Sequence, residues 1–242
     1  MEDVRYEYLR LADGANLLCK LMGSGAGALC IFVHGLSGDK DGPAGLFDFV
    51  GREICRQHPE ISVLAFDFAP FGGSFGGPIS FASMADQLQC LIELRGPLFS
   101  DIFVIAFSVG SVVSLCAISR LASKLASKVK GIFVNSDFSN SVVISEINLR
   151  GGEIIIPTRF MEERSLFDAR LVLGTRSSWS ALLYSEDDKR AGEFRKVGAL
   201  FDDVVPVPKS DHLFLGLEAR TYLSDALSHI IEKHAISGAD AT

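Results

Sequence analysis

The 242-residue sequence contains no apolar stretch of the roughly 18 residues that a membrane-spanning helix needs. Its first residues, among them Glu2, Asp3 and Arg5, are polar and do not form the apolar core of a secretory signal. No run of Lys and Arg is present and the formal net charge is −7, so a general nucleic-acid-binding surface is not expected. These absences predict a cytoplasmic protein with neither a membrane span nor a nucleic-acid partner.

Cysteine is scarce and shows no metal-binding pattern. The five cysteines (Cys19, Cys30, Cys55, Cys90 and Cys116) are odd in number, are not clustered, and lie in apolar runs. We therefore expect buried, reduced thiols. Repeats and low-complexity segments are also missing, and an apolar fraction of 48% excludes a disordered chain. The length and composition predict a single globular domain over residues 1–242.

Short apolar runs alternate with longer amphipathic stretches, a pattern typical of parallel strands covered by helices. Segments 4–11 and 16–22, joined at Asp13-Gly14, predict an antiparallel hairpin. Further strands are predicted at 29–33, 63–66, 102–107, 131–135, 181–184 and 203–207, and helices at 46–57, 81–95, 109–128 and 217–233. The fold class is therefore α/β: a mostly parallel central sheet with helices on both faces and an antiparallel N-terminal hairpin.

The alternation stops after residue 135 and resumes at 181. Segments 142–149 and 153–156 flank Gly151-Gly152 and predict a small hairpin, and Pro157 precedes a helix-like stretch at 159–173. Because the strand and helix pattern then continues, we interpret residues 142–176 as a small cap insertion and not as a second domain.

Ser108 lies in the sequence Ala-Phe-Ser-Val-Gly (106–110), between an apolar strand and a helix pattern that begins at once. Such a turn lifts a serine hydroxyl off the backbone and points the helix N-terminus at a developing oxyanion. Neighbouring chains crowd the turn, so small residues are needed two positions before and after; Ala106 stands where glycine is commoner, and Gly110 is retained. Taken alone, the pentapeptide also fits an ordinary turn in which Ser108 caps the helix.

The first predicted parallel strand ends in Phe-Val-His-Gly-Leu (32–36). A glycine at position 35 would let the neighbouring main-chain N–H approach a substrate. The N–H groups of Leu36 and Val109 are therefore predicted to form an oxyanion hole, with His34 bonding within its own loop. A surface turn is the alternative location for His34.

A serine nucleophile needs a general base, and histidine has a suitable pKa. Of the five histidines, His58 lies at a predicted helix end, and His229 and His234 lie in the C-terminal helix pattern. His212 instead follows the last predicted strand, so its loop opens on the same edge of the sheet as the Ser108 turn. The sequence thus predicts His212 as the base.

The histidine in turn needs a carboxylate to orient it. Three consecutive acids follow the strand at 181–184, and the chain order serine, acid, histidine favours Asp188, with Asp187 close behind. Asp137 competes because it follows the strand ending at 135. Asp211 is disfavoured because side chains of adjacent residues diverge. A solvated acidic turn is the alternative for Asp187 and Asp188.

With these features in order, the sequence resembles the α/β-hydrolase superfamily over nearly its whole length. Residues 34–40 are similar to the His-Gly-x-x-Gly-x-Lys loop of feruloyl and cinnamoyl esterase-like enzymes, and residues 66–74 stand in the place of their Asp-x-x-Gly-x-Gly-x-Ser loop. Residues 185–188 match the Gly-x-x-Asp acid turn, which selects Asp188 over Asp187. Residues 211–214 resemble the Asp-His-Phe-Phe segment that carries the catalytic histidine. The chain departs from this pattern at Ala106 and Ser185, where glycine is usual.

The resemblance implies a serine hydrolase that cleaves a carboxylic ester of a small-molecule acyl substrate through an acyl-enzyme, using Ser108, His212 and Asp188. It implies no metal and no organic cofactor. The same triad would also suit a thioester, amide or carbon–carbon bond, and a second alternative is a non-catalytic ligand-binding or interaction protein on a hydrolase scaffold. Phenylalanines in such numbers are more often core, but the candidate pocket residues are Phe47, Phe71, Phe75, Phe107 and Phe160.

Overall fold

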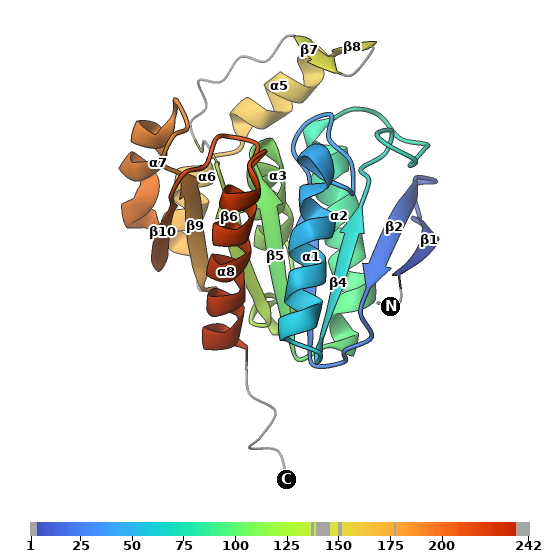
Figure 1. Cartoon of the computed structure of the whole chain (residues 1–242). Coiled ribbons are helices and arrows are strands. Elements are labelled where there is room, and N and C mark those ends of the chain that lie inside the picture. The colour runs from blue at the N-terminus through green and yellow to red at the C-terminus, as the bar shows by residue number, and fades with distance from the viewer. Residues whose placement is uncertain (1–3, 137, 139–145, 150–151, 177, 236–242) are drawn as a thin grey trace.

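An eight-stranded sheet forms the centre of the computed structural model, which describes residues 4–136, 138, 146–149, 152–176 and 178–235 (Figure 1). The strand order is β1-β2-β4-β3-β5-β6-β9-β10. The strands are β1 (Val4–Arg10), β2 (Asn16–Met22), β3 (Ala28–Val33), β4 (Ile61–Phe66), β5 (Asp101–Phe107), β6 (Val129–Val134), β9 (Ser180–Ser185) and β10 (Asp203–Val207). β2 pairs antiparallel with both β1 and β4, and all other pairs are parallel, as the sequence predicted.

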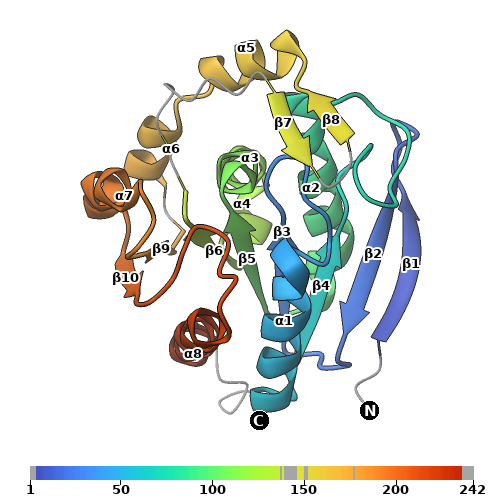
Figure 2. The ribbon, with the colours of Figure 1, turned by 45° about the horizontal axis from the view of Figure 1, so that its top comes forward.

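Helices cover both faces of this sheet. α1 (Leu46–Gln57) and α8 (Leu217–His234) lie side by side on one face, and α2 (Phe81–Arg95) and α3 (Val109–Ser119) lie on the other (Figures 1 and 2). α7 (Ala191–Val197) follows β9, and short 3₁₀ turns occupy Pro43–Gly45, Gly96–Leu98 and Gly198–Leu200. The sandwich of helix, sheet and helix confirms the predicted fold class.

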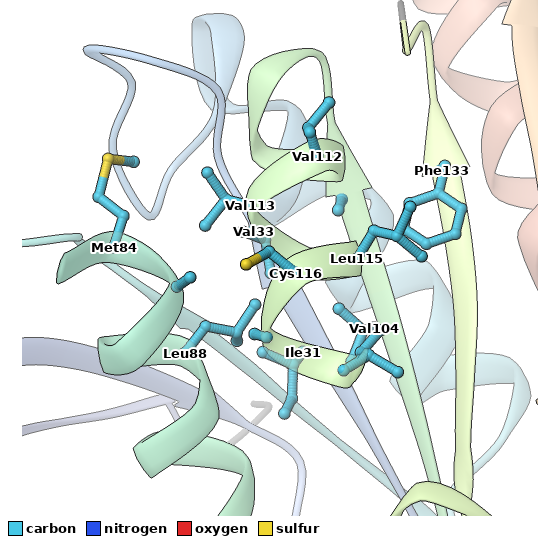
Figure 3. Close-up of a cluster of buried hydrophobic side chains, with 14 of the residues drawn as sticks. Ile31, Val33, Met84, Leu88, Val104, Val112, Val113, Leu115, Cys116 and Phe133 are labelled. Carbon is cyan, nitrogen blue, oxygen red and sulfur yellow. The ribbon is translucent and has the colours of Figure 1, made fainter. Parts of the chain in front are cut away.

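Alternation along the buried strands divides the core into two layers. Ile31, Val33 and Val104 point toward Leu88 of α2 and Cys116 of α3, in the cluster drawn in Figure 3. The intervening strand residues belong to the layer beneath α1 and α8. Because these strands are buried on both faces, they read as continuous apolar runs in the sequence.

The predicted helix at 109–128 is wrong in length. α3 ends at Ser119, and a separate one-turn helix, α4 (Ser123–Ala126), precedes β6. A continuous helix over 20 residues would be about 30 Å long, whereas the seven-residue strand β5 is about 23 Å long. The chain therefore has to leave the helix early to re-enter the sheet.

The small hairpin predicted from segments 142–149 and 153–156 is present. It consists of β7 (Glu146–Leu149) and β8 (Gly152–Ile155), which pair antiparallel. The predicted residues 142–145 lie outside the described residues. The predicted helix at 159–173 is wrong, because it is broken into α5 (Thr158–Leu166) and α6 (Ala169–Thr175). Asp168 causes the break by accepting a hydrogen bond from the N–H of Leu171 at 2.9 Å, which starts a new helix.

The hairpin and α5 lie over the edge of the sheet where the parallel strands end (Figure 1). α5 is attached to the start of α2. The carboxylate of Glu163 accepts the N–H of Ala82 at 3.0 Å, and the rings of Phe81 and Phe160 meet edge to face at 6.0 Å. Desolvation by burial acts to raise the pKa of Glu163, but the hydrogen bonds from Ala82 and Arg159 outweigh it, and the pKa is lowered.

All five cysteines are free thiols, and all except the partly exposed Cys90 are buried. Burial raises the pKa of Cys19 to about 12 and also raises that of Cys30. These thiols therefore stay protonated and unreactive. In the described part of the chain, every helix is too short or too polar to cross a bilayer.

Candidate active site

Ser108 occupies the turn between β5 and α3 in a strained backbone conformation, with φ 52° and ψ −126°. Its N–H donates to the carbonyl oxygen of Val134 at 2.9 Å. The turn packs closely against the end of β3, because a Cβ atom at Gly110 would lie 2.4 Å from the carbonyl oxygen of His34. Only glycine fits there without movement of the backbone, which is the crowding that the sequence motif anticipated.

Two main-chain N–H groups flank this serine. Val109 is the first residue of α3 and Leu36 lies in the loop after β3. Among the described residues, neither N–H has a hydrogen-bond acceptor. The loop passes beside the serine, since a Cβ at Gly35 would lie 3.4 Å from the Cβ of Ser108. Both predicted oxyanion donors thus lie on segments that border Ser108.

His34 is buried and fixes the loop in which Leu36 lies. Its Nδ1 donates to the carbonyl oxygen of Gly35 at 2.7 Å, and its Nε2 accepts the N–H of Phe68 at 2.9 Å. Burial lowers the pKa of His34, which keeps the ring neutral with its proton on Nδ1. The alternative of a surface turn is wrong, because only 1% of His34 is exposed.

The carboxylate of Asp67 holds the same loop from the opposite side. Asp67 is fully buried and accepts the N–H groups of Lys40 at 2.5 Å and Gly73 at 2.7 Å. A Cβ at Gly72, whose φ is +55°, would lie 2.3 Å from Oδ2 of Asp67. The aspartate and glycines of segment 66–74 therefore have a structural explanation: they support the loop that presents Leu36.

His212 lies in the loop after β10 and pairs with Asp188 in the loop after β9. Nδ1 of His212 and Oδ2 of Asp188 are 2.5 Å apart, and the other oxygen of Asp188 accepts the N–H of Arg190 at 2.8 Å. The Asp188 side chain is 4% exposed and that of His212 is 32% exposed. The carboxylate is thus shielded from water, and the imidazole is open to it on one side.

The competing acids take other positions. Asp187 is exposed, and its N–H donates to Ser210. Asp211 accepts the N–H groups of Leu213 and Leu215 and so caps its own turn. Asp137 lies outside the described residues. Among the acids that the structure describes, Asp188 is the one that meets His212.

Strand register brings these loops to one edge of the sheet. Phe107 pairs with Val134, Val134 with Leu183, and Ser185 with Val207, so β5 and β6 end level with each other, and β9 and β10 end together two residues farther on. Ser108, Asp188 and His212 follow three of those ends. Among the described residues, none accepts a hydrogen bond from the hydroxyl of Ser108 or donates one to it, and this includes His212.

Asn135, which follows β6, ties the acid and histidine loops together. Its Nδ2 donates to the carbonyl oxygen of His212 at 2.9 Å and to Oγ of Ser185 at 2.8 Å, and its Oδ1 accepts the N–H of Ser185 at 2.7 Å. Asn135 is buried with φ 49°, a region that asparagine tolerates better than most residues. Sequence reasoning missed this role, although an asparagine directly after a buried strand was a signal.

Arg190 is the other neighbour of His212 that sequence reasoning missed. Its Nη2 lies 3.1 Å from Nδ1 and 3.2 Å from Nε2 of the imidazole. Its guanidinium also packs over the ring of Phe194 at 5.4 Å. An arginine two positions after the acid has no pattern that would have identified it.

Of the five phenylalanines considered for a pocket, Phe75 is exposed and the other four are buried in the core. Within the described residues, no three His, Cys, Asp or Glu side chains are grouped in a way that could hold a metal ion. The candidate site comprises a serine, a pair formed by a histidine and a carboxylate, and two main-chain N–H groups.

No protein-family model matches the chain, and no curated protein does. Among solved structures, it is similar to Est1E from Butyrivibrio proteoclasticus with ferulic acid bound. The TM-score is 0.75 and the sequence identity 12%, and the match covers 94% of this chain and 98% of that one. DcsB in complex with its substrate analogue gives a TM-score of 0.77 at 14% identity, over 97% of this chain and 100% of that one. A thioesterase domain from the curacin biosynthetic pathway gives a TM-score of 0.67 at 12% identity, over 95% of this chain and 99% of that one. At these identities the likeness concerns the fold, and the chain has the predicted α/β-hydrolase fold.

Proposed function

We propose that this chain is a serine hydrolase that cleaves a carboxylic ester of a small molecule through an acyl-enzyme. The observation that carries the proposal is the backbone of Ser108, held at φ 52° and ψ −126° at the start of a helix. A conformation of this kind costs about 1–3 kcal/mol and persists where the surrounding structure over-determines it, most often at functional sites. An ordinary helix-capping serine has an extended backbone and accepts a hydrogen bond from the first helical turn, whereas Ser108 does neither.

The pair formed by His212 and Asp188 supplies the base. Because Asp188 bonds to Nδ1, it fixes the tautomer that leaves the Nε2 lone pair available to take the proton of Ser108. The hydrogen bond between a catalytic serine and its histidine is often long in the absence of substrate and shortens when the substrate binds. Asp188 then stabilises the imidazolium that forms, and His212 returns the proton to the leaving alcohol. Water attacks the acyl-enzyme in the second half of the reaction, with His212 as base again.

The N–H groups of Leu36 and Val109 receive the oxyanion of the tetrahedral intermediate. Each such donor contributes about 3 kcal/mol to transition-state stabilisation. The N-terminus of α3 adds a favourable field at the same point. The loop of Leu36 is held by His34 and Asp67, so this donor needs little reorganisation during the reaction.

The neighbours in fold support an ester substrate. Est1E binds ferulic acid, and another similar structure is an esterase domain from a Rhodothermus marinus protein with a TM-score of 0.73 at 14% identity. We place the acyl pocket at the edge of the sheet where Ser108 and His212 stand, with residues 142–176 as a small cap of the single domain. The described part of that segment, α5 above all, lies over this edge (Figure 2).

A panel of p-nitrophenyl esters of increasing acyl length, with one aromatic acyl donor, tests the proposal. We expect hydrolysis by the wild type and its loss in Ser108→Ala. Ser123→Ala, which removes an exposed hydroxyl in α4, is the matched control and should keep full activity. Hydrolysis that persists in Ser108→Ala would overturn the proposal. Matched thioester and amide donors identify the bond that the enzyme prefers, and activity confined to the aromatic donor would favour a cinnamoyl-type substrate.

A further inference from the structure

Arg190 lies against the face of the His212 ring. Its Nη2 is almost equally far from the two ring nitrogens, at 3.1 and 3.2 Å. An atom in the plane of the ring could not be that close to both without striking the ring carbon between them. The guanidinium nitrogen therefore stands over the ring, and the in-plane direction from Nε2 stays open.

The position of Arg190 is fixed from two further sides. Its guanidinium packs over the Phe194 ring at 5.4 Å, and its main-chain N–H donates to Oδ1 of Asp188 at 2.8 Å. The side chain of Arg190 is 36% exposed. Contact with the rings of His212 and Phe194 holds the Arg190 side chain in place before any ligand binds. A ligand that binds the guanidinium therefore causes little further loss of side-chain entropy.

The charge of Arg190 is only partly satisfied. Its closest approach to Asp188 in an ion pair is 3.9 Å, from Nε to Oδ1, which is beyond hydrogen-bond range. The carboxylate of Asp188 already accepts hydrogen bonds from Nδ1 of His212 and from the main-chain N–H of Arg190. Within the described part of the chain, Nη1 of Arg190 has no acceptor. The guanidinium thus presents an unused donor beside the proposed base.

This arrangement works against a neutral substrate. When His212 accepts the serine proton it becomes an imidazolium, in contact with a guanidinium of the same charge. A substrate anion on Arg190 would offset that repulsion as the imidazolium forms. The anion would therefore stabilise the transition state as well as the ground-state complex. Its interaction with Arg190 would affect both kcat and KM.

We propose that Arg190 is a specificity-determining residue that selects esters whose acyl group carries a carboxylate. The proposal rests on the proposed serine hydrolase function and names its substrate class. The carboxylate binds the free face of the guanidinium by a charge-assisted hydrogen bond, while the ester carbonyl reaches Ser108.

Two esters of similar length test this proposal: mono-p-nitrophenyl adipate, which ends in a carboxylate, and p-nitrophenyl heptanoate, which ends in a methyl group. Arg190→Gln is expected to lower kcat/KM for the adipate ester by about 10-fold to 100-fold, the range for a hydrogen bond to a charged group. Its kcat/KM for the heptanoate ester should be equal to that of the wild type or higher. Arg190→Lys should restore part of the preference. Lys189→Gln removes an exposed positive charge one residue away and should leave the preference as it is.

An equal loss on both esters in Arg190→Gln would show that the residue only positions His212, and would overturn the proposal. A wild type that does not prefer the adipate ester would do the same. If Arg190→Gln does not fold, inhibition of the wild type decides: free adipate should compete with the heptanoate ester at lower concentration than hexanediol does. Equal inhibition by the two compounds, or none by adipate, contradicts the proposal. Failure of the hydrolase function itself would look different, because neither ester would be turned over.

Discussion

The side-chain amide of Asn135 donates to the main-chain carbonyl oxygen of His212 across 2.9 Å. The same side chain makes two hydrogen bonds with Ser185, at the end of the strand that leads to Asp188. One buried asparagine thus sets the separation of the two loops that carry the histidine and the acid. Since Asn135 touches neither side chain of that pair, it acts by positioning.

Replacing Asn135 with alanine leaves the carbonyl of His212 and the N–H of Ser185 without their partner. At about 1–3 kcal/mol for each of the two buried unsatisfied groups, we expect the free energy of unfolding to fall by about 2–6 kcal/mol. We also expect kcat to fall more than KM changes. Asn135→Gly is the control for backbone strain, because glycine accepts φ 49° and lacks only the side-chain bonds. Urea unfolding curves and ester kinetics measure both effects; a glycine variant as stable as the wild type would contradict the account.

Gly110→Ala tests the close packing of the Ser108 turn. The added methyl group would lie 2.4 Å from the carbonyl oxygen of His34, so one of the two backbones must move. We expect at least about a 100-fold loss of activity, because small displacements of reacting groups have effects of that size. Gly174→Ala in α6 is the matched control, since its methyl group meets no atom within 4 Å and favours the helix. Normal kinetics in Gly110→Ala would show that the turn does not position Ser108.

The choice between neighbouring acids is tested by Asp188→Asn and Asp187→Asn. The first replaces the carboxylate that bonds to His212 and should lower kcat on the order of 10⁴-fold. The second replaces an exposed carboxylate and should leave kcat within about twofold of the wild type. Similar losses of kcat in the two variants, or a larger loss in Asp187→Asn, would contradict the choice of Asp188 as the acid that orients His212.

His34 gives a prediction for the pH dependence of stability. Its pKa in the folded protein is lowered by burial, whereas the unfolded chain binds a proton at its ordinary pKa of about 6.5. Below that pH the unfolded state holds more protons at this site, so the contribution of His34 to stability falls as the pH falls. The stability of the folded protein should therefore fall as the pH falls from about 7.5 to about 5.

His34→Gln isolates this contribution, because glutamine keeps an acceptor for the N–H of Phe68 but does not titrate. The variant should be less stable than the wild type at neutral pH, and the difference should shrink toward pH 5. Denaturant unfolding of both proteins across that range provides the comparison. A difference that does not change with pH would mean that His34 keeps its ordinary pKa when folded.

The succession of strands along the chain and the position of Ser108 could be predicted because both depend on local signals. Buried parallel strands read as short apolar runs, and the crowded turn requires small residues at fixed positions around the serine. The end of α3 was not predicted, because its apolar pattern continues past residue 119 while the length of the sheet decides where the helix stops.

The histidine and acid loops, and the pairing of His212 with Asp188, were predicted from the places of these residues after β10 and β9. The sequence left Asp187 and Asp137 as alternatives to Asp188, and resemblance to a known turn favoured Asp188 over Asp187. In the structure the N–H of Arg190 bonds to that carboxylate, a contact fixed by the fold of the turn and not by residue spacing alone. The roles of Asn135 and Arg190 depend on which loops meet in space. The position of Asn135 directly after a buried strand was a signal, whereas no pattern along the chain identifies Arg190.

Labelling with a fluorophosphonate probe tests the central claim most directly, because the probe modifies a serine only where a base and an oxyanion hole activate it. We predict one adduct per chain, on the peptide that contains Ser108, and its absence in Ser108→Ala. His212→Gln should be labelled far more slowly. No adduct on the wild type, or an equal one on Ser108→Ala, would contradict the assignment of this site as that of a serine hydrolase.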